Sequence, residues 1–282
     1  MDGLLSPLSY DFMRQALVAS VLAGILCPVV GTYLIVQRMA MLGDVVAHGV
    51  LPGLAIAQVL RLPMLLGAFA MGLCSTAVIA WIRRQSRIQA DTAMAITFST
   101  FFSLGITLLT VLQTPISLEQ VLFGDILSIV PQDLWQIALI TVIVLTGVKL
   151  FYKELLFFTF DPLGAEALGL PVQRINLGLT AALTLAIIAG IKTVGVILVV
   201  ALMVGPAATA YLLVTELHWM MIGGAGFGVL FGVIGMYGSY YLDLPSGPAI
   251  GLTVFVGFLL ALLFSPRQGI LTRGLRRRMA GE

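Results

Sequence analysis

Apolar runs about as long as a membrane is thick recur along almost the whole sequence. They cover residues 16–36, 45–60, 63–81, 92–112, 134–151, 175–190, 194–214, 220–242 and 248–264. A hydrocarbon core of about 30 Å needs roughly 20 such residues in a helix, whereas the strands of a barrel would show short alternating segments. The sequence therefore predicts an all-α polytopic membrane protein with about nine transmembrane helices, and eight or ten are also compatible.

Charged residues are too rare for a water-soluble domain to accompany these helices. Only 10% of the 282 residues are charged, against about 25% in ordinary globular chains. We therefore expect a single transmembrane domain over residues 1–282. Cys27 and Cys74 lie inside apolar runs with no metal-like or redox-like spacing, and are interpreted as small buried hydrophobic residues.

Two of the runs need a special interpretation. Residues 45–60 are short for a full span, which predicts a broken or re-entrant helix. Residues 181–213 would form one helix about 50 Å long, so they must be divided, and Gly190 and Lys192 are the natural break.

The basic residues predict the orientation, since short cytoplasmic loops are enriched in lysine and arginine. They fall in three groups, which are Arg83, Arg84 and Arg87, then Lys149, Lys153 and Arg174, then Arg267, Arg273, Arg276, Arg277 and Arg278. This places the N-terminus outside and the C-terminus in the cytoplasm. The acidic segment with Glu119, Asp125 and Asp133 then faces the outside.

An aspartate and a histidine interrupt the apolar sequence after the first run. Asp44 and His48 are four residues apart, so on a helix their side chains share one face. Carboxylate oxygen and neutral imidazole nitrogen are both good ligands for first-row divalent metals, which makes the pair a candidate metal site. Two other interpretations stay open, in which Asp44 caps the helix and His48 bonds a neighbouring helix.

Two features flank this pair. Arg38 either pairs with Asp44 or extends to lipid phosphates. The Leu51-Pro52-Gly53 triplet interrupts the following helix, and either exposes backbone carbonyls to a path or forms a simple kink.

A polar interval at residues 160–174 predicts a short helix between two spans. Asp161 followed by Pro162 is typical of a helix start, and Gly169 of a helix end. Such a helix, at about 160–171, suits docking to a cytoplasmic partner. The other interpretation is a connector that lies on the membrane.

The glycines at 224, 228 and 232 are four residues apart, which makes a groove for another backbone, within the chain or between subunits. Glu216 and His218 fall in a short cytoplasmic loop and are interpreted as solvated. Neither a GxxxxGK[ST] phosphate loop nor an HExxH motif is present. Uphill transport would therefore need ATP from another chain. The spans also lack acidic relays, which argues against an ion-coupled pump.

Five motifs, in order, resemble the membrane permease subunits of the ABC transporters that import manganese, zinc or iron(II). They are LIVQRMAMLGDVVAHGVLPG (34–53), LEQVLFGDIL (118–127), FDPLGAEALGLPVQR (160–174), VGVILVVALMVGPAATA (194–210) and YYLDLPSGPAIG (240–251). One departure is Ala47, where a common form of the family has serine before the histidine.

The resemblance implies the type II ABC importer permease fold and a transport subunit without enzymatic activity of its own. It implies a homodimer in a bacterial plasma membrane, two cytoplasmic ABC ATPases that hold the ATP, and an extracytoplasmic metal-binding protein. It implies neither a permanently bound cofactor nor a nucleic-acid partner. Carried over to this sequence, Asp44 and His48 become the metal-coordinating pair. The ATPase-coupling residues become Asp161, Pro162, Ala165, Glu166 and Gly169.

The Leu-Pro-Gly after the histidine resembles the manganese and iron branch of the family more than the zinc branch, which favours Mn(II) as the cargo, with Zn(II) and Fe(II) as alternatives. A hypothesis from another class is a polytopic intramembrane enzyme or scaffold that uses Asp44 and His48 as an acid/base pair. Such an enzyme would need more polar groups at one depth than the sequence offers.

Overall fold

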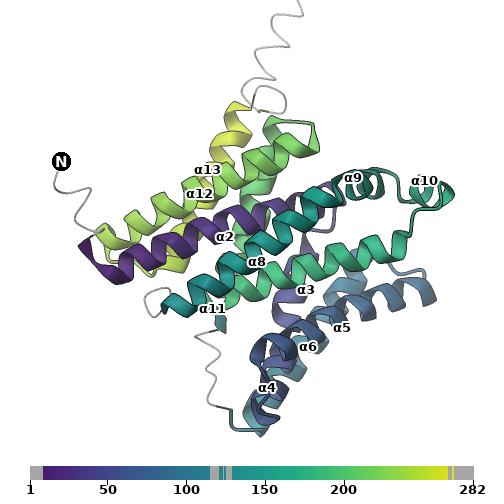
Figure 1. The fold of residues 1–282 in the computed structure, drawn as a ribbon, viewed down its shortest axis with the longest axis horizontal. Helices are drawn as coiled ribbons and strands as arrows, with labels where there is room; N and C mark the ends of the chain where they lie inside the picture. The colour runs from purple at the N-terminus through teal and green to yellow at the C-terminus, as the bar shows by residue number, and fades with distance from the viewer. Residues whose placement is uncertain (1–8, 115–120, 123, 125–128, 266–268, 270–282) are drawn as a thin grey trace, which may run out of the picture.

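A computed structural model describes residues 9–114, 121–122, 124, 129–265 and 269, of which 192–193 only by their backbone. Glu119, Asp125 and the arginines between 267 and 278 lie outside the described residues. Within these ranges the regular structure is helical, with no strand (Figure 1). The helices are α2 (Asp11–Val36), α3 (Met41–Gly49), α4 (Leu51–Val59), α5 (Met64–Gln85), α6 (Ala90–Val111), α8 (Pro131–Leu150), α9 (Tyr152–Phe160), α10 (Pro162–Ala167), α11 (Val172–Leu213), α12 (Leu217–Leu242) and α13 (Ser246–Phe264).

The described part of the chain contains nine helical segments that are long and apolar enough to cross a membrane, which confirms the predicted number. α3 and α4 together make one of them, Met41–Val59. This span begins four residues before the predicted start at 45. Its only interruption is at Val50, because Pro52 has no N–H to donate to the His48 carbonyl.

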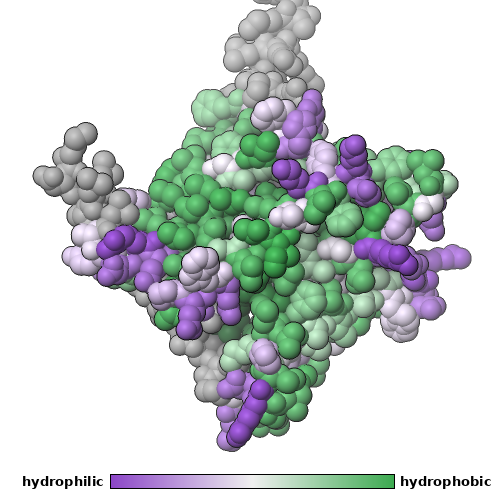
Figure 2. Space-filling view, in the orientation of Figure 1, coloured by the Kyte–Doolittle hydropathy of each residue, from purple (hydrophilic) through white to green (hydrophobic). Residues whose placement is uncertain are grey.

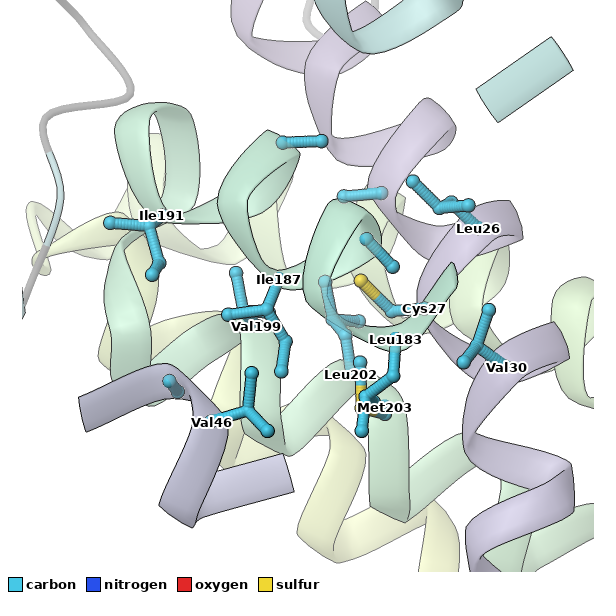
Figure 3. Packing of buried hydrophobic residues seen from close by; sticks show 14 of the residues in the cluster. Leu26, Cys27, Val30, Val46, Leu183, Ile187, Ile191, Val199, Leu202 and Met203 are labelled. Atoms are coloured by element: carbon cyan, nitrogen blue, oxygen red, sulfur yellow. The ribbon is translucent and has the colours of Figure 1, made fainter. Parts of the chain in front are cut away.

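α11 supplies two of the nine spans, Val172–Ile191 and Val194–Leu213. The predicted division is confirmed, but the non-helical backbone is at Gly195, with φ 78° and ψ 161°, rather than at Gly190 or Lys192. Only glycine adopts this conformation readily. A side chain at Gly190 would contact Val199, so the chain turns back on itself here. Figure 3 shows Leu183 and Ile187 of the first half packed with Val199 and Leu202 of the second.

α2 is the central helix of the bundle. Every residue from Leu26 to Leu34 is buried, which fits a helix that is apolar on all sides. α11, α12 and α8 surround it, while α3 to α6 form a separate group of helices beside them (Figure 1). Figure 2 shows apolar residues over the middle of one face and hydrophilic residues gathered toward its edges, as expected for a protein embedded in lipid.

Glycines bring α2 into backbone contact with its neighbours. Gly24 and Gly228 face each other so closely that a side chain at either would meet the other's backbone, and Gly31 lies against the Met203 carbonyl. Gly224 lies against Pro28, and Gly232 against Ser20. The glycine groove of α12 therefore accommodates α2 of the same chain, which decides between the two interpretations of this spacing.

Two short helices lie together at one end of the bundle, beside the C-terminal end of α2 (Figure 1). These are α9 and α10, the segment that the sequence singles out for docking. The opposite end carries the start of α2, where Tyr10 lies near Phe12 and Tyr240.

We expect Gly228→Ala to lower the free energy of unfolding by about 1–3 kcal/mol, since the added methyl group would press against the backbone of Gly24. Gly226→Ala is the matched control on the same helix, because nothing lies within 4 Å of an added methyl group there. Denaturant unfolding of the purified protein in detergent measures both. Equal stability of the two variants would contradict the close α2–α12 contact.

Candidate metal site

The candidate metal ligands lie on the accessible face of α3. Leu42, Gly43, Val45, Val46, Ala47 and Gly49 are buried, and the residues that stay accessible are Met41, Asp44 and His48. At about 100° per residue these three side chains fall within an arc of about 60°. The structure thus confirms that Asp44 and His48 share one face of a helix.

Asp44 does not cap this helix, so that interpretation is wrong. The N-cap of α3 is Ala40, and Asp44 lies in the first turn after it. The helix begins early because the turn after α2 leads directly into it, with N–H groups of Leu42 and Gly43 bonding the carbonyls of Met39 and Ala40.

The span that carries the pair is held by small residues of α5 and α6. A side chain at Gly49 would meet Ser75, and one at Gly105 would meet Leu51 and Pro52. Gly53 lies in contact with the backbone of Gly67. Leu51, Pro52 and Gly53 are all buried in this packing, which favours the kink interpretation of the triplet. The face of α3 that carries Asp44 and His48 is therefore fixed relative to two other spans.

A hydrogen bond selects the tautomer of the His48 ring. Nδ1 lies 3.0 Å from the backbone carbonyl oxygen of Asp44. A carbonyl oxygen only accepts, so in the neutral imidazole Nδ1 carries the hydrogen and Nε2 keeps its lone pair. A neutral imidazole with Nδ1–H bonded to the backbone and Nε2 free is the usual form of a metal ligand. The bond lies within α3, and not to a neighbouring helix as the alternative interpretation required.

Two phenyl rings of α6 lie against the other sides of this imidazole. The ring centroids of His48 and Phe98 are 4.8 Å apart with planes at 74°, and those of His48 and Phe102 are 5.0 Å apart at 84°. Both are edge-to-face contacts, which aromatic rings prefer to direct stacking.

Arg38 takes a structural position between α2 and α3. Among the residues that the structure describes, no ion pair joins Arg38 to Asp44. Its φ is 58°, and its N–H bonds the Ile35 carbonyl while the Met39 N–H bonds that of Leu34. This is a Schellman end for α2, with arginine where glycine is usual. Its exposed side chain agrees with an anchoring charge rather than a partner of Asp44.

One chain offers an incomplete set of metal ligands. Within the described residues, no group of three or more His, Cys, Asp and Glu side chains is placed to hold an ion. Asp44 and His48 supply one carboxylate and one nitrogen, so further ligands must come from water, backbone or another molecule.

The short helix α10 has the predicted caps at both ends. Asp161 Oδ1 accepts a hydrogen bond of 2.9 Å from the Gly164 N–H, and Pro162 opens α10. Gly169, with φ 80°, ends it in a Schellman motif in which its N–H bonds the Glu166 carbonyl and the Leu170 N–H bonds that of Ala165.

The two faces of α10 differ in exposure. Ala165 is fully buried, so it faces the rest of the chain, whereas Leu163 and Leu168 are 80% and 75% exposed. Glu166 is also exposed. α10 therefore presents two leucines and a carboxylate on an open surface at the end of the bundle.

A polar contact joins α9 to the end of α2. Gln37 Nε2 donates to Thr159 Oγ1 at 3.4 Å, across 122 residues of sequence. Thr159 is buried near the end of α9, two residues before the cap of α10, and Gln37 is the C-cap of α2. The chain thus connects the docking segment to the turn that leads into α3.

The second histidine lies far along the sequence in a different setting. His218 Nε2 is 3.4 Å from Glu216 Oε2, and both side chains are largely exposed at the start of α12. This agrees with the solvated interpretation.

Sequence reasoning missed four side chains that shape these sites. Phe98 and Phe102 lie in an apolar run among other apolar residues, and only their four-residue spacing could have suggested a common face. Leu163 and Leu168 are large apolar residues inside a polar interval, a signal that was available.

Comparison with known proteins gives concordant matches. The model of the ABC 3 transport family matches residues 9–265. The chain is 41% identical over 271 residues to the manganese transport system membrane protein MntC of Listeria monocytogenes, covering 96% of each chain. It is 37% identical to a Haemophilus influenzae protein named "probable iron transport system membrane protein", covering 97% of each. The solved structure of PsaBC from Streptococcus pneumoniae in complex with a Fab superposes with a TM-score of 0.86 at 34% identity, covering 96% of each chain.

We expect Arg38→Gly to raise the free energy of unfolding by about 1 kcal/mol, because glycine adopts the positive φ at this position without strain. Metal binding should stay unchanged if the guanidinium is not part of the site. Arg38→Ala is the control, since it removes the charge and keeps the strain. Denaturant unfolding and metal titration check both variants, and a loss of metal binding in both would give Arg38 a role at the site.

Proposed function

Because this chain belongs to the ABC 3 transport family, we propose that it is the membrane permease of an ATP-driven importer of divalent transition metal ions, with Mn(II) as the preferred cargo. The observation that carries the proposal is the pair Asp44 and His48, which lie one turn apart on the accessible face of a membrane span with Nε2 of the histidine free. A carboxylate and an imidazole bind such ions without a redox step.

The preference for Mn(II) rests on the relatives and on the ligand chemistry. The MntC proteins are named for manganese transport and one relative is named for iron. An oxygen and nitrogen site accepts Mn(II), but binds Zn(II) more tightly by the Irving–Williams order. Fe(II) and Zn(II) are therefore the alternative cargoes, and we propose that an extracytoplasmic metal-binding protein makes part of the selection before the ion reaches the permease.

A second copy of the chain would complete the site. A two-fold axis beside the accessible face of α3 would add another carboxylate and another imidazole, which gives four protein ligands around one path. An isologous homodimer of this kind fits the incomplete ligand set of the single chain.

We propose that α10 is the contact for a cytoplasmic ABC ATPase, with one ATPase on each permease copy. The exposed Leu163, Glu166 and Leu168 supply an apolar contact with a charge at its edge. Asp161, Pro162 and Gly169 set the ends of this helix, and Ala165 seats it on the permease. Movement of α10 would reach α2 and α3 through α9 and the contact between Thr159 and Gln37.

The transport cycle follows from these parts. ATP binding draws the two α10 helices together, and the permease halves rock so that the path opens to one side and then the other. The ion passes between the Asp44 and His48 pairs, which must bind it weakly enough to release it.

The proposed orientation puts α10 in the cytoplasm and the N-terminus outside. Arg83 and Arg84 end α5, and Lys149 lies in the last turn of α8. Figure 1 places the end of α5 at the same end of the bundle as α9 and α10. The positive-inside rule then assigns that end to the cytoplasm of a bacterial plasma membrane.

Asp44→Asn and His48→Ala should each abolish Mn(II) uptake into cells or proteoliposomes while the assembly stays intact. Each change removes one of two ligands that one copy provides. His218→Ala is the matched control, because it removes the other histidine of the chain, which is exposed beside Glu216. Normal uptake by both Asp44 and His48 variants would refute the site, and an absence of metal-stimulated ATP hydrolysis in the purified assembly would refute the transporter.

Glu166→Lys should weaken the association with the ATPase, since it reverses the charge on the exposed face of α10. Glu216→Lys is the control, as it makes the same change on another exposed glutamate of a connecting segment. Co-purification of the permease with its ATPase measures the effect. If the two variants retain the ATPase equally, α10 is not the docking element.

A further inference from the structure

The imidazole of His48 is confined on more than one side. Nδ1 is bonded to the carbonyl of Asp44 in the same helix, and the rings of Phe98 and Phe102 lie at 4.8 and 5.0 Å from the imidazole centroid. The two phenyl rings are themselves nearly parallel, with centroids 5.8 Å apart and planes at 13°. Their four-residue spacing on α6 places them on one face of that helix.

Phe98 and Phe102 pack against the edge of the apolar core rather than inside it. Phe98 and Phe102 are half-buried, as is His48, while their neighbour Phe101 is buried. Both rings therefore lie close enough to the surface of the bundle to contact the half-buried imidazole of His48.

Helix α6, which carries both rings, is packed closely against the span that contains α3. Gly105 of α6 lies against Leu51 and Pro52 at the start of α4, and Phe101 lies 4.0 Å from the position of a side chain at Gly49. The two helices are thus in close contact on the C-terminal side of His48. Phe98 and Phe102 are therefore held in place by the same span whose histidine they contact.

Rotation of the imidazole would break these contacts. Turning the ring over would bring a carbon atom to the Asp44 carbonyl and lose the Nδ1 hydrogen bond, and swinging it away would lose both edge-to-face contacts. The hydrogen bond sets which nitrogen is free, and the phenyl rings set where the imidazole lies.

On the basis of the proposed function of Asp44 and His48, we infer that Phe98 and Phe102 are positioning residues for the metal ligand His48. They hold the imidazole in the one orientation that leaves Nε2 available to the ion on the same face as the Asp44 carboxylate. Neither ring binds the ion, and each acts through the histidine. Groups that orient a ligating histidine by a hydrogen bond typically contribute roughly 10- to 100-fold to metal affinity, and we expect a similar range for rings that orient it by contact.

The test uses the full chain in lipid nanodiscs, titrated with Mn(II), and pulsed electron paramagnetic resonance to detect nitrogen bound to the ion. Phe98→Ala and Phe102→Ala should weaken Mn(II) binding by roughly 10- to 100-fold. They should also reduce the nitrogen signal at saturating Mn(II), because a mobile imidazole is ligated in fewer molecules. Phe102→Tyr, which keeps the ring, should restore both.

The matched control is Phe227→Ala. Phe227 is also half-buried and stacks on a phenylalanine four residues later, Phe231 at 5.7 Å, but on α12. Its loss should cost similar packing and leave the affinity and the nitrogen signal unchanged. Phe98→Leu replaces Phe98→Ala if the alanine variant does not fold, since leucine keeps apolar volume without the ring.

The outcomes separate this inference from the function on which it rests. His48→Ala should abolish the nitrogen signal, and a retained signal there refutes the proposed site itself. If His48→Ala loses the signal while the Phe98 and Phe102 variants keep wild-type affinity and signal, the site stands and the positioning role is refuted. Equal loss in Phe227→Ala would also refute it, because general packing would then explain the effect.

Discussion

Close contact between helix backbones at glycine is the constraint on which this bundle depends. In lipid the apolar side chains gain little by meeting one another, so helix association relies on packing and on short approach distances. Gly24 and Gly228 bring α2 against α12, and Gly31 brings it against α11. Gly53 and Gly67 do the same for α4 and α5. The glycines at these contacts fix the separation of the helices that they join.

This packing also fixes the positions of the candidate ligands. α3 is short and has no side-chain cap, so on its own it would be marginal. Contacts of Gly49 with Ser75 and of Gly105 with Leu51 hold the span formed by α3 and α4 between α5 and α6. The buried face is used for these contacts, and what remains accessible is the face with Asp44 and His48. The same arrangement brings the rings of α6 against the histidine. Packing of α3 and α4 against α6 therefore determines both the fold here and the orientation of His48.

The sequence predicted the parts of this structure that depend on local chemistry. Span number, the caps of α10 and the common face of Asp44 and His48 follow from hydropathy, capping residues and helix period. What it missed depends on tertiary contact or on exceptions to residue preference. Arg38, Arg61, Gln113 and Asp243 take positive φ at helix ends where glycine is expected, so those ends carry no sequence signal. Gly190 and Gly195 both lie near the turn of α11, and the sequence does not show which of them has the non-helical backbone. The role of Phe98 and Phe102 depends on the position of His48, which is a tertiary contact.

An incomplete site is also what transport requires. A resident metal is held by a closed set of ligands on one rigid chain, whereas a carried ion must leave on each cycle. With two ligands on each copy of the proposed dimer, the site exists fully only when the two α3 helices approach, and rocking of the copies changes that distance without deforming either chain. The conformational change that releases the ion then takes place at the interface between the copies. A histidine held firmly within each copy serves this mechanism. If the imidazole could rotate and follow the ion, movement of the halves would not break the contact between ion and ligand. The mechanism therefore requires both rigid ligands within each half and a movable boundary between the halves.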